Sequence, residues 1–377
     1  MLEKTCSILM ATGELSGEIY AADLATMLMN RYPSMKCYGM GSKILENSGV
    51  EIVANTQDLS IIGAIEVITK FVKIYRAFQR MCQFLREKKP DLLILIDYPG
   101  FNLRLAKIAK KNGVKVLYYI TPKVWAWKRG RLKTIKKYVD MAAIIFPFEV
   151  ELYQKYNIPA KYVGNPLLQL IQSKTEAASN NGLPDNHSPT VGLFPGSRSS
   201  EIKRLLPVIL DAAKIIREKY GDAQFIVSQA DSISGQELQH WMQNNTLKIK
   251  IVKGQNYEII KKSDVVISAS GTATLEIALL ETPLVIIYKI SWLEYQLAKR
   301  LIKIPYVGLC NILAQKGVAR ELLQHDASPK NIAEEVIKII EDLPYRNQMI
   351  GEFKKIKESL EMTEQTDLIE LVMGMLA

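Results

Sequence analysis

Short uninterrupted apolar runs alternate along the chain with stretches that have helical spacing. In the first half the runs cover residues 6–12, 91–97 and 114–121, and a loop containing glycine follows each of the first two. Stretches with apolar residues three and four positions apart come after these loops. Because the runs show no polar alternation, they predict strands covered on both faces, and therefore a parallel sheet with helices on each side.

The same alternation resumes after a stretch of different composition. Residues 172–190 lose periodicity and are rich in Asn, Ser, Pro and Gly, which is typical of a linker. The predicted fold is α/β, with two facing Rossmann-like doubly wound domains and a cleft between them. The predicted parts are a first domain, a linker, a second domain and a helical segment crossing back to the first, at 1–168, 169–190, 191–344 and 345–377.

Composition supports two globular domains and a cytosolic location. The 377 residues are 48% hydrophobic and 23% charged, which is ordinary for folded domains, and the length favours two of them. No apolar stretch approaches the roughly 18 residues that a membrane-spanning helix needs. The four cysteines lack CxxC spacing, so buried reduced thiols are expected rather than a zinc site or disulfides: Cys6, Cys37, Cys82 and Cys310.

The formal charge of +10 predicts attraction to anionic partners, and its distribution narrows the choice. Lys and Arg concentrate at 70–89 and 123–137, interleaved with apolar side chains. Within residues 61–84 they form one side of a basic amphipathic helix, which is typical either of docking on a membrane surface or of an ordinary helix packed on its own sheet. No helix-turn-helix, zinc or RNA-binding signature accompanies the charge, which argues against nucleic acid.

Aromatic and basic side chains also meet in a loop that follows the run 114–121. Trp125, Trp127, Lys128 and Arg129 lie within five positions. Such a segment suits acyl chains that meet anionic headgroups. The tryptophans are equally consistent with anchors in the core.

In an open parallel sheet, ligands collect outside the carboxyl ends of the strands, so the loops after strands are the informative ones. Gly196, Ser197 and Arg198 follow a predicted strand and open a helix. Backbone N–H groups and a guanidinium there suit a phosphate group. A plain strand-to-helix turn with a solvated arginine is the alternative.

A second loop of the second domain has the same character. Ser270, Gly271 and Thr272 bring hydroxyls and N–H groups to a helix start, which suits a pyrophosphate. Glu276, one turn further, can accept hydrogen bonds from both hydroxyls of a ribose, although an acid in a first turn is also common. No acid ends the next strand in the dinucleotide pattern, so a nucleoside diphosphate is the favoured ligand.

In the first domain, Asp97 ends the strand 91–97 and is the candidate general base. An N-cap or Asx-turn aspartate is the alternative for the same position. The earlier loop contains Glu14, Ser16, Gly17 and Glu18, and it lacks the full GxGxxG pattern. We interpret it as a substrate-side loop with backbone donors.

Several longer blocks stand in an order that resembles the lipid-A-disaccharide synthase family. They are GELSGE, DLSIIGAIEV, IDYPGFN, TPKVWAWKRGR, FPFE, GSRSSEI, SASGTATLE and KIPYVGLCNILA, and they span roughly residues 7–325. The resemblance implies an inverting glycosyltransferase of the GT-B type. It would join UDP-2,3-diacylglucosamine to 2,3-diacylglucosamine 1-phosphate and release UDP and the β-1,6-linked disaccharide phosphate.

The resemblance also extends the candidate sites. It adds Tyr288, Lys289 and Asn311 to the donor pocket. It implies an acceptor side made by Glu14, Ser16, Gly17, Glu18, Asn102, Trp125, Trp127, Lys128 and Arg129. Two positions depart from the family's pattern, because the family more typically has Asp where this chain has Glu18 and where it has Gly100.

The expected mechanism is a single displacement. Asp97 takes the proton of the acceptor hydroxyl, and Arg198 with the loop Ser270–Thr272 stabilises the departing diphosphate. No DxD pair is placed to hold magnesium, so we expect a metal-free reaction with no cofactor besides the UDP-sugar substrate.

The expected location is the inner face of the inner membrane, held peripherally by an anionic membrane surface. The further partners are the two lipid substrates and, in a homodimer, a second copy of the chain; nucleic acid is not expected. The competing functions are another UDP-sugar enzyme of the same fold, such as a 2-epimerase or a transferase with a different acceptor, and a basic nucleic-acid-binding protein.

Overall fold

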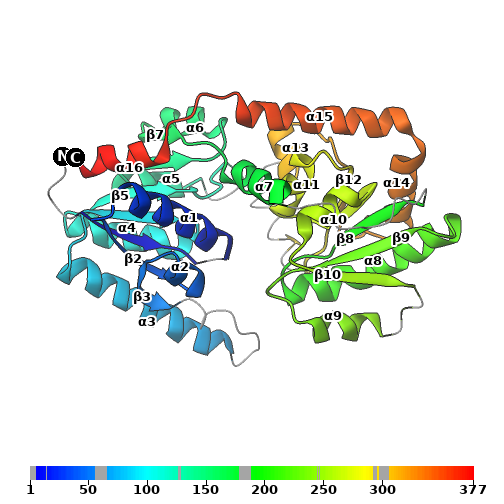
Figure 1. The fold of residues 1–377 in the computed structure, drawn as a ribbon, viewed down its shortest axis with the longest axis horizontal. Coiled ribbons are helices and arrows are strands. Elements are labelled where there is room, and N and C mark those ends of the chain that lie inside the picture. Colours follow the sequence, from blue (N-terminus) through cyan, green and yellow to red (C-terminus); the bar gives the residue numbers. More distant parts are fainter. Residues whose placement is uncertain are drawn as a thin grey trace. The chain divides into compact units, whose positions relative to one another are not determined.

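The protein divides into two compact units, each built on its own parallel sheet (Figure 1). The computed structural model describes residues 6–13, 15–55, 66–125, 129–177, 188–243, 245, 247–291, 295–296 and 305–377. Unit 1 comprises Met1–Pro166 and Thr363–Ala377, and unit 2 comprises Leu167–Met362.

Unit 1 contains a seven-stranded sheet in the order β3-β2-β1-β4-β5-β6-β7. The strands are β1 Ser7–Ala11, β2 Lys36–Gly41, β3 Glu51–Asn55, β4 Leu92–Ile96, β5 Lys115–Tyr119, β6 Met141–Ile144 and β7 Ala160–Tyr162. All pairings are parallel, and every residue of β4 is buried. The apolar runs therefore form strands covered on both faces, as the sequence predicts.

Helices cover the two faces of this sheet unequally. The core on one face includes residues of α3 Glu66–Glu87, α4 Pro99–Lys111, α5 Arg131–Tyr138 and α6 Glu149–Lys155. The other core includes residues of α1 Leu15–Arg31, α2 Lys43–Asn47 and the C-terminal α16 Leu368–Leu376. No helix within the described ranges combines the length and apolar character needed to span a bilayer.

Unit 2 contains a six-stranded parallel sheet in the order β10-β9-β8-β11-β12-β13. Its strands are β8 Thr190–Phe194, β9 Gln224–Gln229, β10 Ile249–Lys253, β11 Val265–Ala269, β12 Leu284–Tyr288 and β13 Glu321–Leu323. Its helices include α7 Pro166–Ala177, α8 Ser199–Lys219, α9 Gly235–Met242, α10 Asn256–Lys262, α11 Ala273–Leu279, α13 Leu309–Ala314, α14 Pro329–Glu341 and α15 Leu343–Glu361. Helices and strands alternate here as they do in unit 1.

The observed unit boundaries differ from the predicted ones at two places. Residues 169–177 continue α7 instead of starting a linker. The crossing back to unit 1 comes after Met362 and not at residue 345. The physical reason is that α15 buries Met349, Phe353 and further apolar residues against α11, α13 and α14 of unit 2. Only α16 adds to the core of unit 1.

Candidate active site

Asp97 lies in a strained turn at the carboxyl end of β4. Asp97 and Tyr98 both have left-handed backbone, with φ of 47° and 44°. A non-glycine residue in this region costs on the order of 1–3 kcal/mol, so the surroundings must hold it there. The Asp97 N–H donates to the carbonyl of Ile120 at 3.2 Å, which ties this turn to the neighbouring loop after β5.

The loop after β1 lies directly against the Asp97 turn. A Cβ atom on Gly13 would lie 2.2 Å from the Tyr98 ring, so only glycine permits this approach. Gly17 packs against Ile96, the last residue of β4. Because β1 and β4 are neighbours in the sheet, the structure brings these two predicted loops together.

Two predicted acceptor residues of unit 1 are turned into the protein. Asn102 is buried, and its Nδ2 donates to the carbonyls of Ala11, Ile96 and Asp97 at 3.2, 3.2 and 2.7 Å. Glu18 is also buried, and its Oε1 accepts hydrogen bonds from the N–H groups of Ser42 and Leu45 at the start of α2. Both side chains hold backbone in place. The Glu18 side chain, which is one methylene longer than an aspartate, reaches the start of α2.

Ser16 and Gly100 lie at open positions. Ser16 is exposed, and Glu14 lies outside the described residues. A Cβ atom on Gly100 would meet nothing within 4 Å, so the aspartate more typical of the family has room here. This chain has no second carboxylate at that position.

Trp125 is anchored on unit 1 through a buried carboxyl group. Its indole Nε1 donates to Glu149 Oε1 at 3.0 Å, and its ring lies edge-on to Phe148 at 5.4 Å. The interpretation of Trp125 as an anchor in the protein therefore fits the structure. Arg129 is exposed, while Trp127 and Lys128 lie outside the described residues.

Burial gives Glu149 an unusual protonation equilibrium. It raises the pKa of the carboxyl from 4.5 to about 8, against smaller opposing effects of the Trp125 hydrogen bond, the backbone of Phe146 and the charge of Lys123. Tyr153 lies close enough to Glu149 that its own pKa is raised, mainly by burial and then by that carboxyl. Glu149 thus belongs to a buried polar cluster beside the loop after β5.

In unit 2, Gly196, Ser197 and Arg198 lead from β8 into α8. Gly196 has φ of +115°, which favours glycine, and a Cβ there would collide with Glu201. Glu201 Oε2 accepts hydrogen bonds from the N–H groups of Ser197 and Arg198 at 2.9 and 3.2 Å. Its Oε1 pairs with the Arg198 guanidinium at 3.1 Å. An internal carboxylate therefore occupies the donors expected to bind a phosphate group.

The loop after β11 emerges beside the loop after β8, because the two strands pair along their length. Gly271 and Thr272 are exposed, and Glu276 in α11 is half-buried. The Ser270 hydroxyl donates to the carbonyl of Val307 at 2.9 Å. The structure thus brings the two predicted phosphate loops to one edge of one sheet.

Asn311 supports this edge from inside the unit. It is fully buried, its Oδ1 accepts from the N–H groups of Val318 and Ala319, and its Nδ2 donates to Glu321 and to the Ala319 carbonyl. Glu321 in turn accepts from the N–H groups of Val307 and Gly308. Asn311 therefore stabilises the 307–308 loop through Glu321, with its side chain directed into the unit.

Tyr288 ends β12 at the same edge, and Lys289 follows it. Both are half-buried, and burial lowers the pKa of Lys289 from 10.5.

Two acids that organise these loops, Glu201 and Glu321, were not predicted from the sequence. The acid at the third helical position is a recognisable capping pattern that would have found Glu201. Glu321 acts on residues more than ten positions away, so no local signal marks it.

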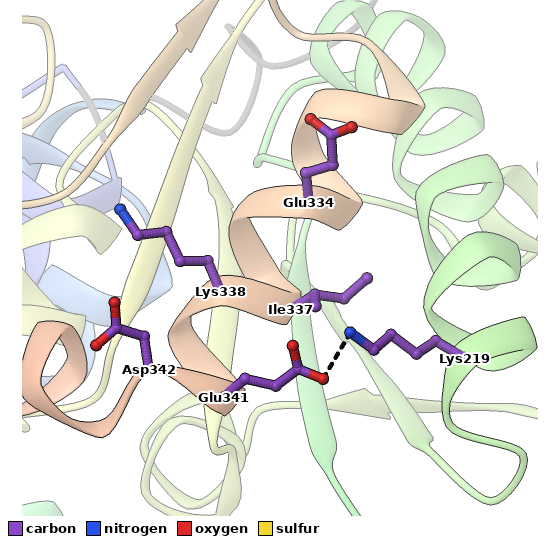
Figure 2. Close-up of a pocket in the computed structure, with 6 residues that line it drawn as sticks. All are labelled: Lys219, Glu334, Ile337, Lys338, Glu341 and Asp342. Atoms are coloured by element: carbon purple, nitrogen blue, oxygen red, sulfur yellow. Dashed lines mark ion pairs between the residues drawn. The ribbon is translucent and has the colours of Figure 1, made fainter.

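Figure 2 shows an open pocket of unit 2, lined by residues from the ends of α8 and α14. Lys219 and Glu341, the last residues of α8 and α14, pair across it at 2.5 Å. Because α8 starts beside the carboxyl end of β8 and runs back along the sheet, its end lies at the opposite edge. We assign no chemistry to this pocket. Its lining is Lys219, Glu334, Ile337, Lys338, Glu341 and Asp342.

Comparisons of the sequence with known proteins agree on one family. The chain matches the family model of lipid-A-disaccharide synthetase over residues 8–371. It is 44% identical to a lipid-A-disaccharide synthase of Trichlorobacter lovleyi, covering 94% of this chain and 93% of the relative. A lipid-A-disaccharide synthase of Geobacter sulfurreducens is 41% identical, covering 94% of this chain and 92% of the relative.

A solved structure supports the fold. The UDP-GlcNAc 2-epimerase from Neisseria meningitidis bound to UDP-GlcNAc has a TM-score of 0.65 at 13% identity, covering 98% of this chain and 100% of that one. Likeness at this identity concerns the fold alone. The predicted class, two Rossmann-like domains of the GT-B type, is confirmed.

The raised pKa of Glu149 predicts a pH-dependent stability. Between pH 4.5 and 8 the unfolded carboxyl loses its proton while the folded one keeps it, so the free energy of unfolding falls as pH rises, by at most about 5 kcal/mol. Glu149→Gln cannot titrate, so urea unfolding at pH 5 and pH 8 should show a smaller fall for this variant. The exposed Glu151→Gln on the same helix serves as control; equal falls in all three proteins would refute the argument.

Proposed function

The chain belongs to the lipid-A-disaccharide synthase family, and from this we propose how its two units carry out the reaction. It is a glycosyltransferase of lipid A disaccharide synthesis, acting on a UDP-sugar donor and a lipid acceptor. The observation that carries this conclusion is the family match over residues 8–371, which includes the loops at both sheet edges. We propose UDP-2,3-diacylglucosamine as donor and 2,3-diacylglucosamine 1-phosphate as acceptor.

We propose that unit 2 binds the UDP moiety. The carboxylate of Glu201 on the N–H groups of Ser197 and Arg198 supports this, because it shows that these donors suit an oxyanion. The Arg198 side chain is 68% exposed, and an exposed ion pair contributes only about 0–1 kcal/mol. A diphosphate with two charges can therefore displace Glu201. Glu276 would accept hydrogen bonds from the ribose hydroxyls, with Tyr288 and Lys289 beside it.

We propose that Asp97 of unit 1 is the general base. Its carboxylate takes the proton from the acceptor's primary hydroxyl as that oxygen attacks the anomeric carbon of the donor. The bond from this carbon to the diphosphate oxygen breaks, UDP leaves, and the configuration inverts. One displacement needs one base and no covalent enzyme intermediate.

We propose that the reaction needs no metal ion. Negative charge develops on the departing diphosphate, and the Arg198 guanidinium and the loop Ser270–Thr272 would stabilise it; that their loops follow the paired strands β8 and β11 supports this. Among the competing functions, a 2-epimerase is supported by likeness of fold alone, and the family match does not favour it.

The experiment that tests the function is product analysis. The purified protein is incubated with the two proposed substrates, and mass spectrometry should detect the disaccharide phosphate and UDP in equal amounts. The rate should be the same with and without EDTA. Release of the donor's free sugar without disaccharide would contradict the proposed acceptor.

Replacing the base separates chemistry from donor binding. Asp97→Asn should lower turnover by about two to four orders of magnitude, the usual contribution of a general base. UDP affinity, measured by calorimetry, should not change, because the proposed UDP site lies in the other unit. Turnover close to that of the wild type would remove Asp97 from the mechanism.

Arg198 should act on UDP itself. Arg198→Ala removes a charge-assisted hydrogen bond, so UDP affinity should fall by about 10- to 100-fold. Lys203→Ala is a matched control, since it removes an exposed cation from the same helix. Unchanged UDP affinity in Arg198→Ala would place the phosphates elsewhere.

We propose that α3 brings the protein to an anionic membrane surface. Val72 and Tyr75 are 40% and 55% exposed, and they lie on the same helix as the exposed Arg76 and Arg80. Of the predicted helix 61–84, residues 61–65 and the side chains of residues 66–71 lie outside the described residues.

That the protein forms a homodimer remains a prediction from the sequence.

Vesicle binding checks this surface. The protein should sediment with phosphatidylglycerol vesicles more than with phosphatidylcholine vesicles, and salt should weaken the difference. Val72→Ser with Tyr75→Ser should reduce sedimentation. Met27→Ser, which changes an equally exposed apolar residue of α1, should not. Equal loss from both changes would show that α3 is not the docking surface.

A further inference from the structure

Two buried side chains donate to the same backbone oxygen, the carbonyl of Asp97. The Tyr118 hydroxyl donates at 2.8 Å from β5, and Asn102 Nδ2 donates at 2.7 Å from the first turn of α4. Tyr118 and Asn102 are both 0% exposed. Neither side chain therefore contacts solvent, and each is fixed by the core that surrounds it.

These bonds act on backbone that has an unfavourable conformation. Asp97 and Tyr98 are consecutive non-glycine residues with positive φ, and such strain persists only where neighbouring groups impose it. The conformation of Asp97 sets the direction of its Cα–Cβ bond, and so the position from which its carboxylate extends. A residue that holds this backbone therefore determines where the carboxylate lies.

The two donors restrain the turn from different sides. Asn102 also donates to the carbonyls of Ala11 and Ile96, so it connects the ends of β1 and β4. Tyr118 reaches the same oxygen from the adjacent strand β5, where the rest of its ring packs in the core. A phenylalanine would fill that core position equally well, so the hydroxyl itself serves the Asp97 carbonyl.

We infer that Tyr118, together with Asn102, is a positioning residue for the base Asp97. This inference rests on the proposed function, because it takes Asp97 as the group that deprotonates the acceptor. Tyr118 touches neither substrate in this scheme. It acts by keeping the left-handed turn in the one arrangement that places the carboxylate for proton transfer, where small displacements are costly.

The first test removes only the hydroxyl. Tyr118→Phe should lower kcat about ten-fold, the effect of losing one hydrogen bond, with KM for both substrates and UDP affinity within about two-fold of the wild type. Tyr119→Phe is the matched control, because this neighbour in β5 packs on the opposite face of the sheet. A purely structural role of the Tyr118 hydroxyl predicts a lower melting temperature and an unchanged kcat, which would overturn the inference.

A double-mutant cycle tests whether Tyr118 acts through Asp97. In the Asp97→Asn background, Tyr118→Phe should cause no further loss of kcat, because the base it positions is gone. A full ten-fold further loss would show an independent role and overturn the inference. If Asp97→Asn alone keeps turnover, the assignment of the base fails together with the inference. If it slows turnover while Tyr118→Phe does not, only the inference fails.

Discussion

The arrangement of this protein depends on one constraint: both parallel sheets are covered on both faces. Every residue of β4 and of β11 is buried, so exposed polar side chains begin where these two strands end. Asp97 follows β4, and Ser270 follows β11. The proposed catalytic and binding groups therefore lie at the carboxyl edges, where loops can vary without loss of the core.

Buried or half-buried acids organise both edges without taking part in the proposed chemistry. Glu18 binds the N–H groups at the start of α2, Glu201 those at the start of α8, and Glu321 those of the 307–308 loop. Glu149 holds the Trp125 indole. Glu18 and Glu321 satisfy N–H groups in partly buried loops, where an unpaired donor is costly, whereas the donors held by Glu201 are exposed and are those proposed to bind the diphosphate. At Asp97, by comparison, Asn102 and Tyr118 hold the backbone carbonyl.

The same scaffold supports more than one UDP-sugar chemistry, as the likeness to a UDP-GlcNAc 2-epimerase shows. The fold places loops but does not choose the reaction. In the proposed mechanism the reaction depends on a few positions at the two edges, and Gly100 leaves open space beside one of them. Function therefore follows from the loop residues and the backbone that holds them.

The sequence by itself determined the strands, the helices and the loops that carry Asp97, Arg198 and Ser270, because apolar periodicity and strand-to-helix order are local properties. Only the tertiary structure decided that Asn102, Glu18 and Asn311 turn inward, that Trp125 is anchored by Glu149, and that α15 packs on unit 2. The direction of a side chain at a strand end depends on partners far away in sequence. Tyr118 is an example. From the sequence it is one more residue of an apolar strand, and only the structure shows that its hydroxyl donates to the Asp97 carbonyl.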